Sequence, residues 1–158
     1  MKYSKGLNLL KEVEIILCDY LDIDSAGLFL RKEERLSAEV ENALNVDIKK
    51  LRNGYPLAYI RKKADFYGLE FIVNEHVLIP RKETEILVEK SIECIKKLFN
   101  ICNGKKQVKM IEVGVGSGCI SICIANEFNR LQSVSGHRFN ADLSHRLVIL
   151  GLEKSKEV

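Results

Sequence analysis

The fold of this 158-residue chain is decided by one stretch, Val108-Lys109-Met110-Ile111-Glu112-Val113-Gly114-Val115-Gly116-Ser117-Gly118. Its first six residues are mostly apolar, which is typical of a strand that is buried in a sheet. Three glycines then alternate with other residues, and residues 119–128 have the apolar pattern of a helix. The stretch therefore predicts a strand, a tight turn and a helix, which is the unit from which α/β domains are built.

The glycine-rich turn is a candidate ligand site. Glycine has no Cβ, so a ligand can approach the backbone closely, and the N–H groups at a helix start have no partner within the helix. The spacing is G-x-G-x-G, which differs from the G-x-G-x-x-G of nicotinamide-binding folds. A tight turn without any ligand is the alternative. The candidate residues are Glu112, Gly114, Val115, Gly116, Ser117 and Gly118.

The N-terminal part of the chain has the periodicity of helices. We predict helices over residues 7–21, 26–30 and 34–50, with Asp24-Ser25 as an N-cap and Gly54 as a C-terminal stop. The predicted inner faces are Leu10, Val13, Leu17 and Tyr20 in the first helix and Val40, Ala43, Leu44 and Leu51 in the third. No residue in this part suggests chemistry.

The residue pattern changes from helical periodicity to aromatic and β-branched residues near Tyr55. Residues 66–73 are aromatic and β-branched, which predicts a hairpin or short strands. Residues 83–99 predict a long helix. Its expected inner stripe is Leu87, Val88, Ile92, Ile95 and Leu98.

Composition and charge limit the function classes. A net charge of +3 is too small to indicate nucleic-acid binding, and no run approaches the ~18 apolar residues of a membrane span. The N-terminus is not a signal peptide, and five cysteines without a C-x-x-C pair suggest reduced thiols. We therefore expect a cytoplasmic protein. Cys119 and Cys123 could share a helix face in a zinc site, but small buried side chains are the simpler interpretation.

Four motifs together resemble the release factor glutamine methyltransferase family. They cover about residues 1–128 in the family's order, and an acid two positions before the first glycine is typical of methyltransferases. The matches are Arg52, Gly54, Pro56, Tyr59 and Ile60 to R-x-G-x-P-x-x-Y-I; Phe66, Gly68 and Phe71 to F-x-G-x-x-F; 77–85 to V-L-I-P-R-P-E-T-E; and 112–118 to D-x-G-x-G-S-G.

The chain departs from the family pattern in three places. Lys82 replaces the second proline of I-P-R-P-E-T-E, and Arg61-Lys62-Lys63 stands where the family usually has a glycine. After Asn129 we find no second strand ending in the acid that binds the cofactor ribose; position 137 is His, and Asp142-Leu143-Ser144 comes late. A reading-frame disruption would explain this, because the codons of His137-Arg138-Phe139 read one base later can encode Ile-Asp-Leu. A natural divergent ending is the alternative, and the chain is expected to be truncated or frame-disrupted after about residue 129.

The resemblance implies an α/β fold with three parts. These are a helical substrate-docking domain over residues 1–54, a β-hairpin linker over 55–82, and a partial, Rossmann-like class I methyltransferase domain over 83–158. The implied cofactor is S-adenosyl-L-methionine, lined by the loop residues and bordered by Pro80, Arg81, Glu83 and Thr84. The implied reaction is methyl transfer to a glutamine side-chain amide in a peptide chain release factor, carried out by a monomer without direct nucleic-acid contacts.

The family's catalytic N-P-P-Y motif is absent from the sequence. The resemblance therefore assigns no catalytic residue and no metal, and we expect the 158-residue chain to be an inactive fragment. Two alternatives stay open: a non-catalytic binding module that keeps the docking helices, and a nucleotide-binding Rossmann-like protein.

Overall fold

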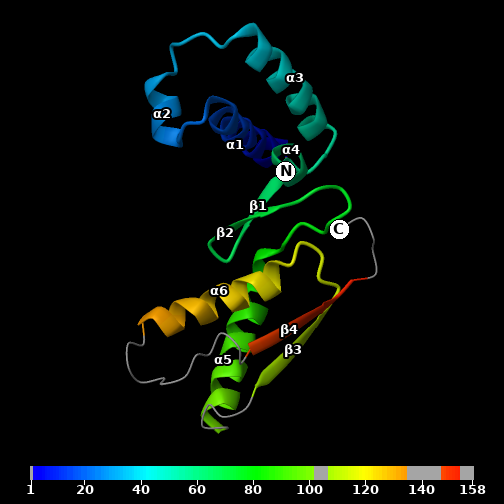
Figure 1. The fold of residues 1–158 in the computed structure, drawn as a ribbon. Coiled ribbons are helices and arrows are strands. Elements are labelled where there is room, and N and C mark those ends of the chain that lie inside the picture. The colour runs from blue at the N-terminus through cyan, green and yellow to red at the C-terminus, as the bar shows by residue number, and fades with distance from the viewer. Residues whose placement is uncertain (1, 102–106, 135–146, 154–158) are drawn as a thin grey trace. The chain divides into compact units, whose positions relative to one another are not determined.

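The computed structural model describes residues 2–101, 107–134 and 147–153, which form helices and two small sheets (Figure 1). The chain divides into two compact units, residues 1–62 and 63–158. The elements are α1 (Lys2–Leu21), α2 (Ser25–Leu30), α3 (Ala38–Arg52), α4 (Leu57–Arg61), β1 (Lys63–Phe66), β2 (Leu69–Ile72), the 3-10 helix η1 (Lys82–Thr84), α5 (Glu85–Ile101), β3 (Val108–Val113), α6 (Cys119–Val134) and β4 (Leu147–Leu152). None of the helices within the described ranges is long and apolar enough to cross a membrane.

The regular elements of the first unit, among its described residues, are all helices. The Asp24 carboxylate accepts a hydrogen bond of 2.7 Å from the Gly27 N–H and caps α2, as the sequence predicts. The third helix begins at Ala38 rather than at 34, because the Ser37 hydroxyl accepts from the Val40 N–H and fixes the helix start there. It ends before Gly54, whose φ of 84° is the left-handed conformation that glycine adopts at a helix C-terminus.

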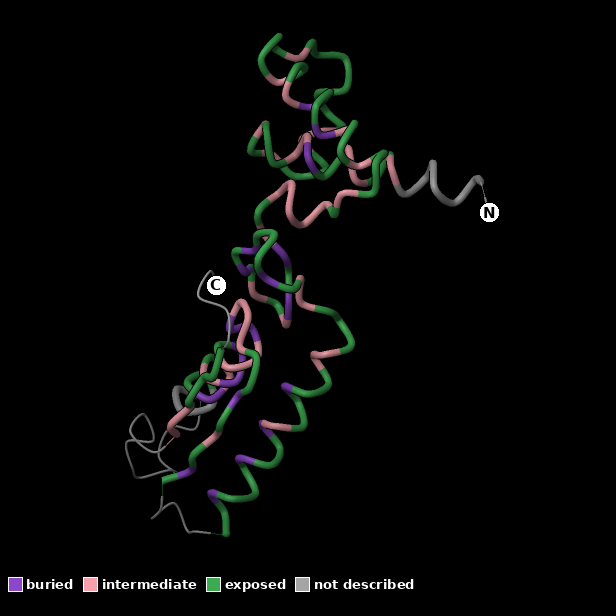
Figure 2. The backbone as a smooth tube through the Cα atoms, turned by 90° about the vertical axis from the view of Figure 1, so that its right-hand side faces the viewer, coloured by how far each residue is buried: buried purple, intermediate pink, exposed green. Residues whose placement is uncertain are grey.

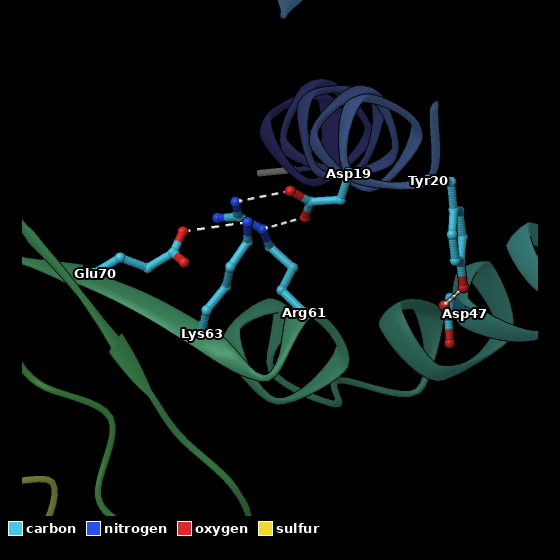
Figure 3. A network of polar contacts seen from close by, with 6 residues as sticks. All are labelled: Asp19, Tyr20, Asp47, Arg61, Lys63 and Glu70. Atoms are coloured by element: carbon cyan, nitrogen blue, oxygen red, sulfur yellow. Dashed lines mark hydrogen bonds and ion pairs between the residues drawn. The ribbon is translucent and has the colours of Figure 1, made fainter. Parts of the chain in front are cut away.

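Two polar contacts connect the helices of this unit (Figure 3). The Tyr20 hydroxyl on α1 donates a 2.5 Å hydrogen bond to the Asp47 carboxylate on α3, and Asp47 is buried. The Arg61 guanidinium on α4 donates to the Asp19 carboxylate on α1 at 2.6 Å. The ends of α1, α3 and α4 are thus held by contacts 27 and 42 residues apart in sequence.

The predicted inner face of α1 is wrong in part. Leu10 and Tyr20 are exposed, and Ile16 is the buried side chain among residues 9–21 of α1. Helix α1 carries apolar residues on more than one stripe, so helical spacing does not decide which stripe meets the neighbouring helices. In α3 the prediction is better, since Leu44 is buried and Ala43 is half-buried.

Lys62 stands at one departure from the family pattern, and its backbone conformation shows why glycine suits this position. It follows α4 with a φ of 57°, which is left-handed, and its N–H donates to the Ala58 carbonyl. An L-residue with a side chain is disfavoured in this conformation, whereas glycine accepts it readily. The basic run Arg61-Lys62-Lys63 therefore includes a position at which the local backbone favours glycine.

The second unit begins with the antiparallel hairpin of β1 and β2. Phe66 pairs with Leu69 across a two-residue turn, Tyr67-Gly68, in which both residues have positive φ. This is the type of turn whose twist matches paired strands. The Tyr67 N–H also donates to the Glu85 carboxylate at 2.8 Å, which attaches the turn to the start of α5. The predicted hairpin is therefore present, over residues 63–72 rather than 66–73, and its role as a linker stays a prediction.

Helix α5 buries one stripe of apolar residues, and Figure 2 shows buried positions recurring along it. The predicted stripe is right in its centre and wrong at its ends, because Leu87 and Leu98 are exposed. Each lies one residue from a buried neighbour, and one residue turns a helix by about 100°. The buried residues are Val88, Ile92, Ile95 and Phe99.

Strands β3 and β4 form a parallel pair, with Val108 beside Leu147 and Val113 beside Leu152. One face of the pair packs in a core shared with the hairpin, α5 and α6; the core includes Phe66, Phe71, Cys123, Ile124 and Phe128. Cys119 and Cys123 are both buried there, which confirms their interpretation as small core side chains.

Strand β4 corrects the sequence analysis, which finds no strand after Asn129. Residues 147–152, Leu-Val-Ile-Leu-Gly-Leu, form it, and its pairing with β3 supplies the hydrogen bonds that such a short apolar run needs. The predicted boundaries at 54/55 and 82/83 stay predictions, while the two compact units meet at Lys62 and Lys63.

Candidate functional site

The glycine-rich loop connects the end of β3 to the start of α6. Gly114, Gly116 and Gly118 have φ values of 72°, 55° and 73°, so all three occupy the left-handed region. The Gly118 N–H donates to the Val115 carbonyl at 2.9 Å, and the Gly118 carbonyl accepts from Ile122 in the first turn of α6. The predicted strand–turn–helix geometry with glycines in conformations that other residues avoid is therefore confirmed.

The loop leaves room beside its backbone. A Cβ placed on Gly114 would meet no atom within 4 Å, and one placed on Gly116 would lie 3.9 Å from the Val77 side chain. The space beside these two glycines is therefore not filled by other described residues of the chain. Open space next to a glycine backbone is what a ligand that approaches closely requires.

Glu112, the acid two positions before the first glycine, is the second-last residue of β3 and is buried. Its Oε2 accepts hydrogen bonds from the hydroxyl and the backbone N–H of Ser121 on α6. Its Oε1 is also buried and has no hydrogen-bond partner among the described residues. A buried carboxylate oxygen without a donor is unfavourable, so this atom is an acceptor whose donor lies outside the described residues.

The second set of predicted residues precedes α5. Pro80 and Thr84 are half-buried, whereas Arg81 and Glu83 are exposed. Glu83 and Thr84 lie in η1, and the Thr84 N–H donates to the carbonyl of Arg81, which precedes η1, at 2.9 Å. Val77, three residues before Pro80, lies near the loop, since a Cβ on Gly116 would be 3.9 Å from its side chain. The assignment of these four residues to a cofactor site stays a prediction.

The structure adds a residue that the sequence analysis misses. Glu153 follows β4 directly, and its carboxylate accepts a hydrogen bond of 2.9 Å from the Gly116 N–H. The adjacent Leu152 carbonyl accepts from the Gly114 N–H at 2.8 Å. An acid at the carboxyl end of the strand beside a glycine loop is where related nucleotide-binding folds place the acceptor for ribose hydroxyls.

A signal for Glu153 is present in the sequence but is easily passed over. Residues 147–152 are apolar and an acid follows them, as in a buried strand that ends at a site. The acid lies 35 residues after Gly118 rather than ~20, so spacing leads to the wrong place. The two candidates that spacing favours, His137 and Asp142, lie outside the described residues.

Comparisons with known proteins find similarity over most of the chain. A family model described as the PrmC N-terminal domain matches residues 10–61. The release factor glutamine methyltransferase of Bacillus anthracis is 35% identical over 143 residues, which cover 90% of this chain and 47% of the relative. Those of Fusobacterium nucleatum and Enterococcus faecalis are 32% and 39% identical, covering 92% and 64% of this chain but 38% and 34% of each relative.

The chain therefore belongs to a class of mixed α/β proteins, with a helical PrmC N-terminal domain followed by small sheets. Within that class it is a homologue of the release factor glutamine methyltransferases. It spans about half the length, or less, of the curated relatives that it matches.

Proposed function

We propose that this chain carries the cofactor loop and the substrate-docking helices of a protein-glutamine methyltransferase that acts on peptide chain release factors. The observation that carries the proposal is the loop itself, with three left-handed glycines between a strand and a helix. Its support is the similarity over 90% of the chain to proteins whose name states this activity. In this proposal β3, α6 and β4 belong to a Rossmann-like class I methyltransferase domain.

The residues of the loop fit S-adenosyl-L-methionine. Gly114 and Gly116 leave space against the backbone, and the Oε1 atom of Glu112 is an acceptor without a donor. Glu153 adds a carboxylate at the end of the neighbouring parallel strand, which suits a pair of ribose hydroxyls. We assign Gly114, Val115, Gly116, Ser117 and Gly118 to the cofactor contact, with Pro80, Arg81, Glu83 and Thr84 at its border.

The chemistry of the reaction defines what the chain must supply. S-adenosylmethionine carries an electrophilic methyl group on its sulfonium sulfur. A neutral glutamine amide nitrogen is a weak nucleophile, so its protons need acceptors and the nitrogen needs close placement in line with the methyl. The described residues supply a place for the cofactor, and the sequence contains no N-P-P-Y motif to hold the amide. We therefore propose cofactor and release-factor binding without methyl transfer for the 158-residue chain.

A binding measurement tests the cofactor part of the proposal. Isothermal titration calorimetry of the purified chain with S-adenosylmethionine should show a single site. Gly116→Ala adds a Cβ beside the ligand and should weaken binding at least tenfold. Gly68→Ala is the matched control, because its φ of 74° imposes the same backbone strain in a hairpin turn remote in sequence from the loop. Equal binding by wild type and Gly116→Ala would remove the loop from the site.

The nucleotide-binding alternative is tested in the same titration. Its support is the position of Glu153 beside a glycine loop, an arrangement that nicotinamide-binding folds also use. Binding of a nicotinamide dinucleotide in preference to S-adenosylmethionine would favour it. The G-x-G-x-G spacing leads us to expect the opposite preference.

A further inference from the structure

Gly151 in β4 has a different role from the loop glycines. It is not among the residues with positive φ, so the backbone does not require glycine at this position. A Cβ placed on it would lie 2.7 Å from the Cγ2 atom of Val115 and 3.7 Å from its Cβ. Atoms of this type do not approach so closely, so Gly151 leaves the space that the Val115 side chain occupies.

Val115 can turn away from an added methyl group only at a conformational cost, because its branched Cβ restricts χ1. A Cβ on Gly151 would lie 3.7 Å from the other methyl carbon, Cγ1, which is an ordinary van der Waals contact, so the close approach is to Cγ2. An alanine at 151 would therefore move either the strand or the loop. Val115 lies between two left-handed glycines, so the loop backbone should move more easily than the strand.

Gly151 also begins a run of three consecutive contacts between β4 and the loop. Gly151 receives the Val115 side chain, the Leu152 carbonyl accepts from Gly114, and the Glu153 carboxylate accepts from Gly116. Gly151 and Leu152 at the end of β4 and Glu153 directly after it thus meet three successive residues of the loop. These contacts connect the loop backbone to the end of β4.

We propose that Gly151 is a positioning residue for the cofactor loop: by lacking a side chain it seats Val115 against β4 and holds the Gly114–Gly116 backbone in its ligand-binding conformation. The proposal rests on the cofactor role assigned to this loop. It also gives residues 151–153 a functional part, in a region of the sequence where no site was expected.

The test is a double-mutant cycle between positions 151 and 115 on the full chain. Gly151→Ala should weaken S-adenosylmethionine binding at least tenfold in calorimetry. In the Val115→Ala background the clashing methyl carbons are gone, so the same Gly151→Ala change should alter affinity by less than about twofold. If Gly151→Ala weakened binding only by disturbing β4, the loss of affinity would be the same in wild type and in Val115→Ala. Equal losses in the two backgrounds, or no loss in wild type, would overturn the proposal.

A second readout separates this proposal from the cofactor assignment. The backbone amide signals of Gly114, Gly116 and Gly118 in ¹H–¹⁵N spectra should shift in Gly151→Ala relative to wild type. They should not shift when the same change is made in Val115→Ala. If the wild-type chain binds no S-adenosylmethionine, the cofactor assignment fails while these signals still decide the positioning role. If Gly151→Ala does not fold, folding of the double variant supports the proposal and its failure to fold overturns it.

Discussion

The Glu153 carboxylate accepts a hydrogen bond of 2.9 Å from the Gly116 backbone N–H, across 37 residues of sequence. The contact brings a negative charge from the end of β4 to the middle of the glycine loop. It places the candidate acceptor for cofactor hydroxyls on a strand that spacing rules do not locate. Glu153 is therefore the residue whose removal most directly tests the geometry of the proposed site.

Glu153→Ala should weaken S-adenosylmethionine binding by about tenfold to a hundredfold, because hydrogen bonds to a charged acceptor contribute roughly 1.5–3 kcal/mol. Titration calorimetry measures the change. Glu93→Ala is a suitable control, since Glu93 forms an exposed ion pair with Lys90 on α5. Tighter binding by Glu153→Ala would mean that the carboxylate competes with the ligand for the Gly116 N–H.

Lys62→Gly should stabilise the chain. Lys62 has a φ of 57°, and the left-handed conformation costs a residue with a side chain about 1 kcal/mol relative to glycine. Urea unfolding should show a gain of about that size. Lys49→Gly provides the contrast, because Lys49 is exposed within α3 and glycine there should cost about 1 kcal/mol. A loss of stability in Lys62→Gly would contradict the structure at the end of α4.

Tyr20→Phe should destabilise the helical unit by about 1–2 kcal/mol, because it removes a hydrogen bond to the buried carboxylate of Asp47. A double-mutant cycle with Asp47→Asn isolates the pair from the nearby contact of Asp47 with Lys50. Additive effects of the two substitutions would show that the pair does not interact in solution.

The same pair has a defined pH dependence. The hydrogen bond to Asp47, followed by burial and the charge of Asp47, raises the pKa of Tyr20 to about 12. A folded pKa above the unfolded value of 10.0 means that the contribution to stability is complete below pH 10 and is lost as the pH rises toward 12. The tyrosinate absorbance that is present in wild type and missing in Tyr20→Phe should therefore develop near pH 12. Development of that absorbance near pH 10 would contradict the contact.

The cysteines should differ widely in reactivity. Cys94 is exposed, whereas burial, together with the neighbouring Cys119 and Glu85, raises the pKa of Cys123 to about 11. At pH 8 roughly one Cys123 thiol in a thousand would be a thiolate, and the thiolate is the reactive form. Mass spectrometry after brief treatment with N-ethylmaleimide should find Cys94 labelled and Cys123 unmodified. Labelling of both cysteines in urea is the control. Rapid labelling of Cys123 in the native protein would contradict its burial in the core.

The sequence predicts some of these features and misses others for physical reasons. Strand β3 and the loop follow from local pattern, because the glycines encode their own backbone conformations. Strand β4 and Glu153 do not, because a short apolar run becomes a strand only through pairing with a partner that is distant in sequence. The exposed positions of Leu87 and Leu98 on α5 depend likewise on which side meets the core.

The last prediction concerns catalysis: the 158-residue chain should bind S-adenosylmethionine but transfer no methyl group to a release factor. The N-P-P-Y motif, which the resemblance implies as the amide-binding site, is absent from the sequence. Placement of a weak nucleophile contributes several kcal/mol to a barrier, and each 1.36 kcal/mol is a factor of about ten in rate. Glu153 is a candidate acceptor for the cofactor, but it does not supply a site for the glutamine amide.

Incubation of the chain with labelled S-adenosylmethionine and a release factor tests this directly, with a full-length relative as positive control. The sheet supports the same expectation, because Ile111 and Val113 on β3 and Leu150 and Leu152 on β4 expose apolar side chains on one face. A site that must exclude water around the sulfonium is poorly served by an uncovered sheet. Label on a release-factor glutamine, abolished by Gly116→Ala, would show that the described residues hold an amide-binding site that neither motif nor geometry reveals. Cofactor binding without label is the result that we expect.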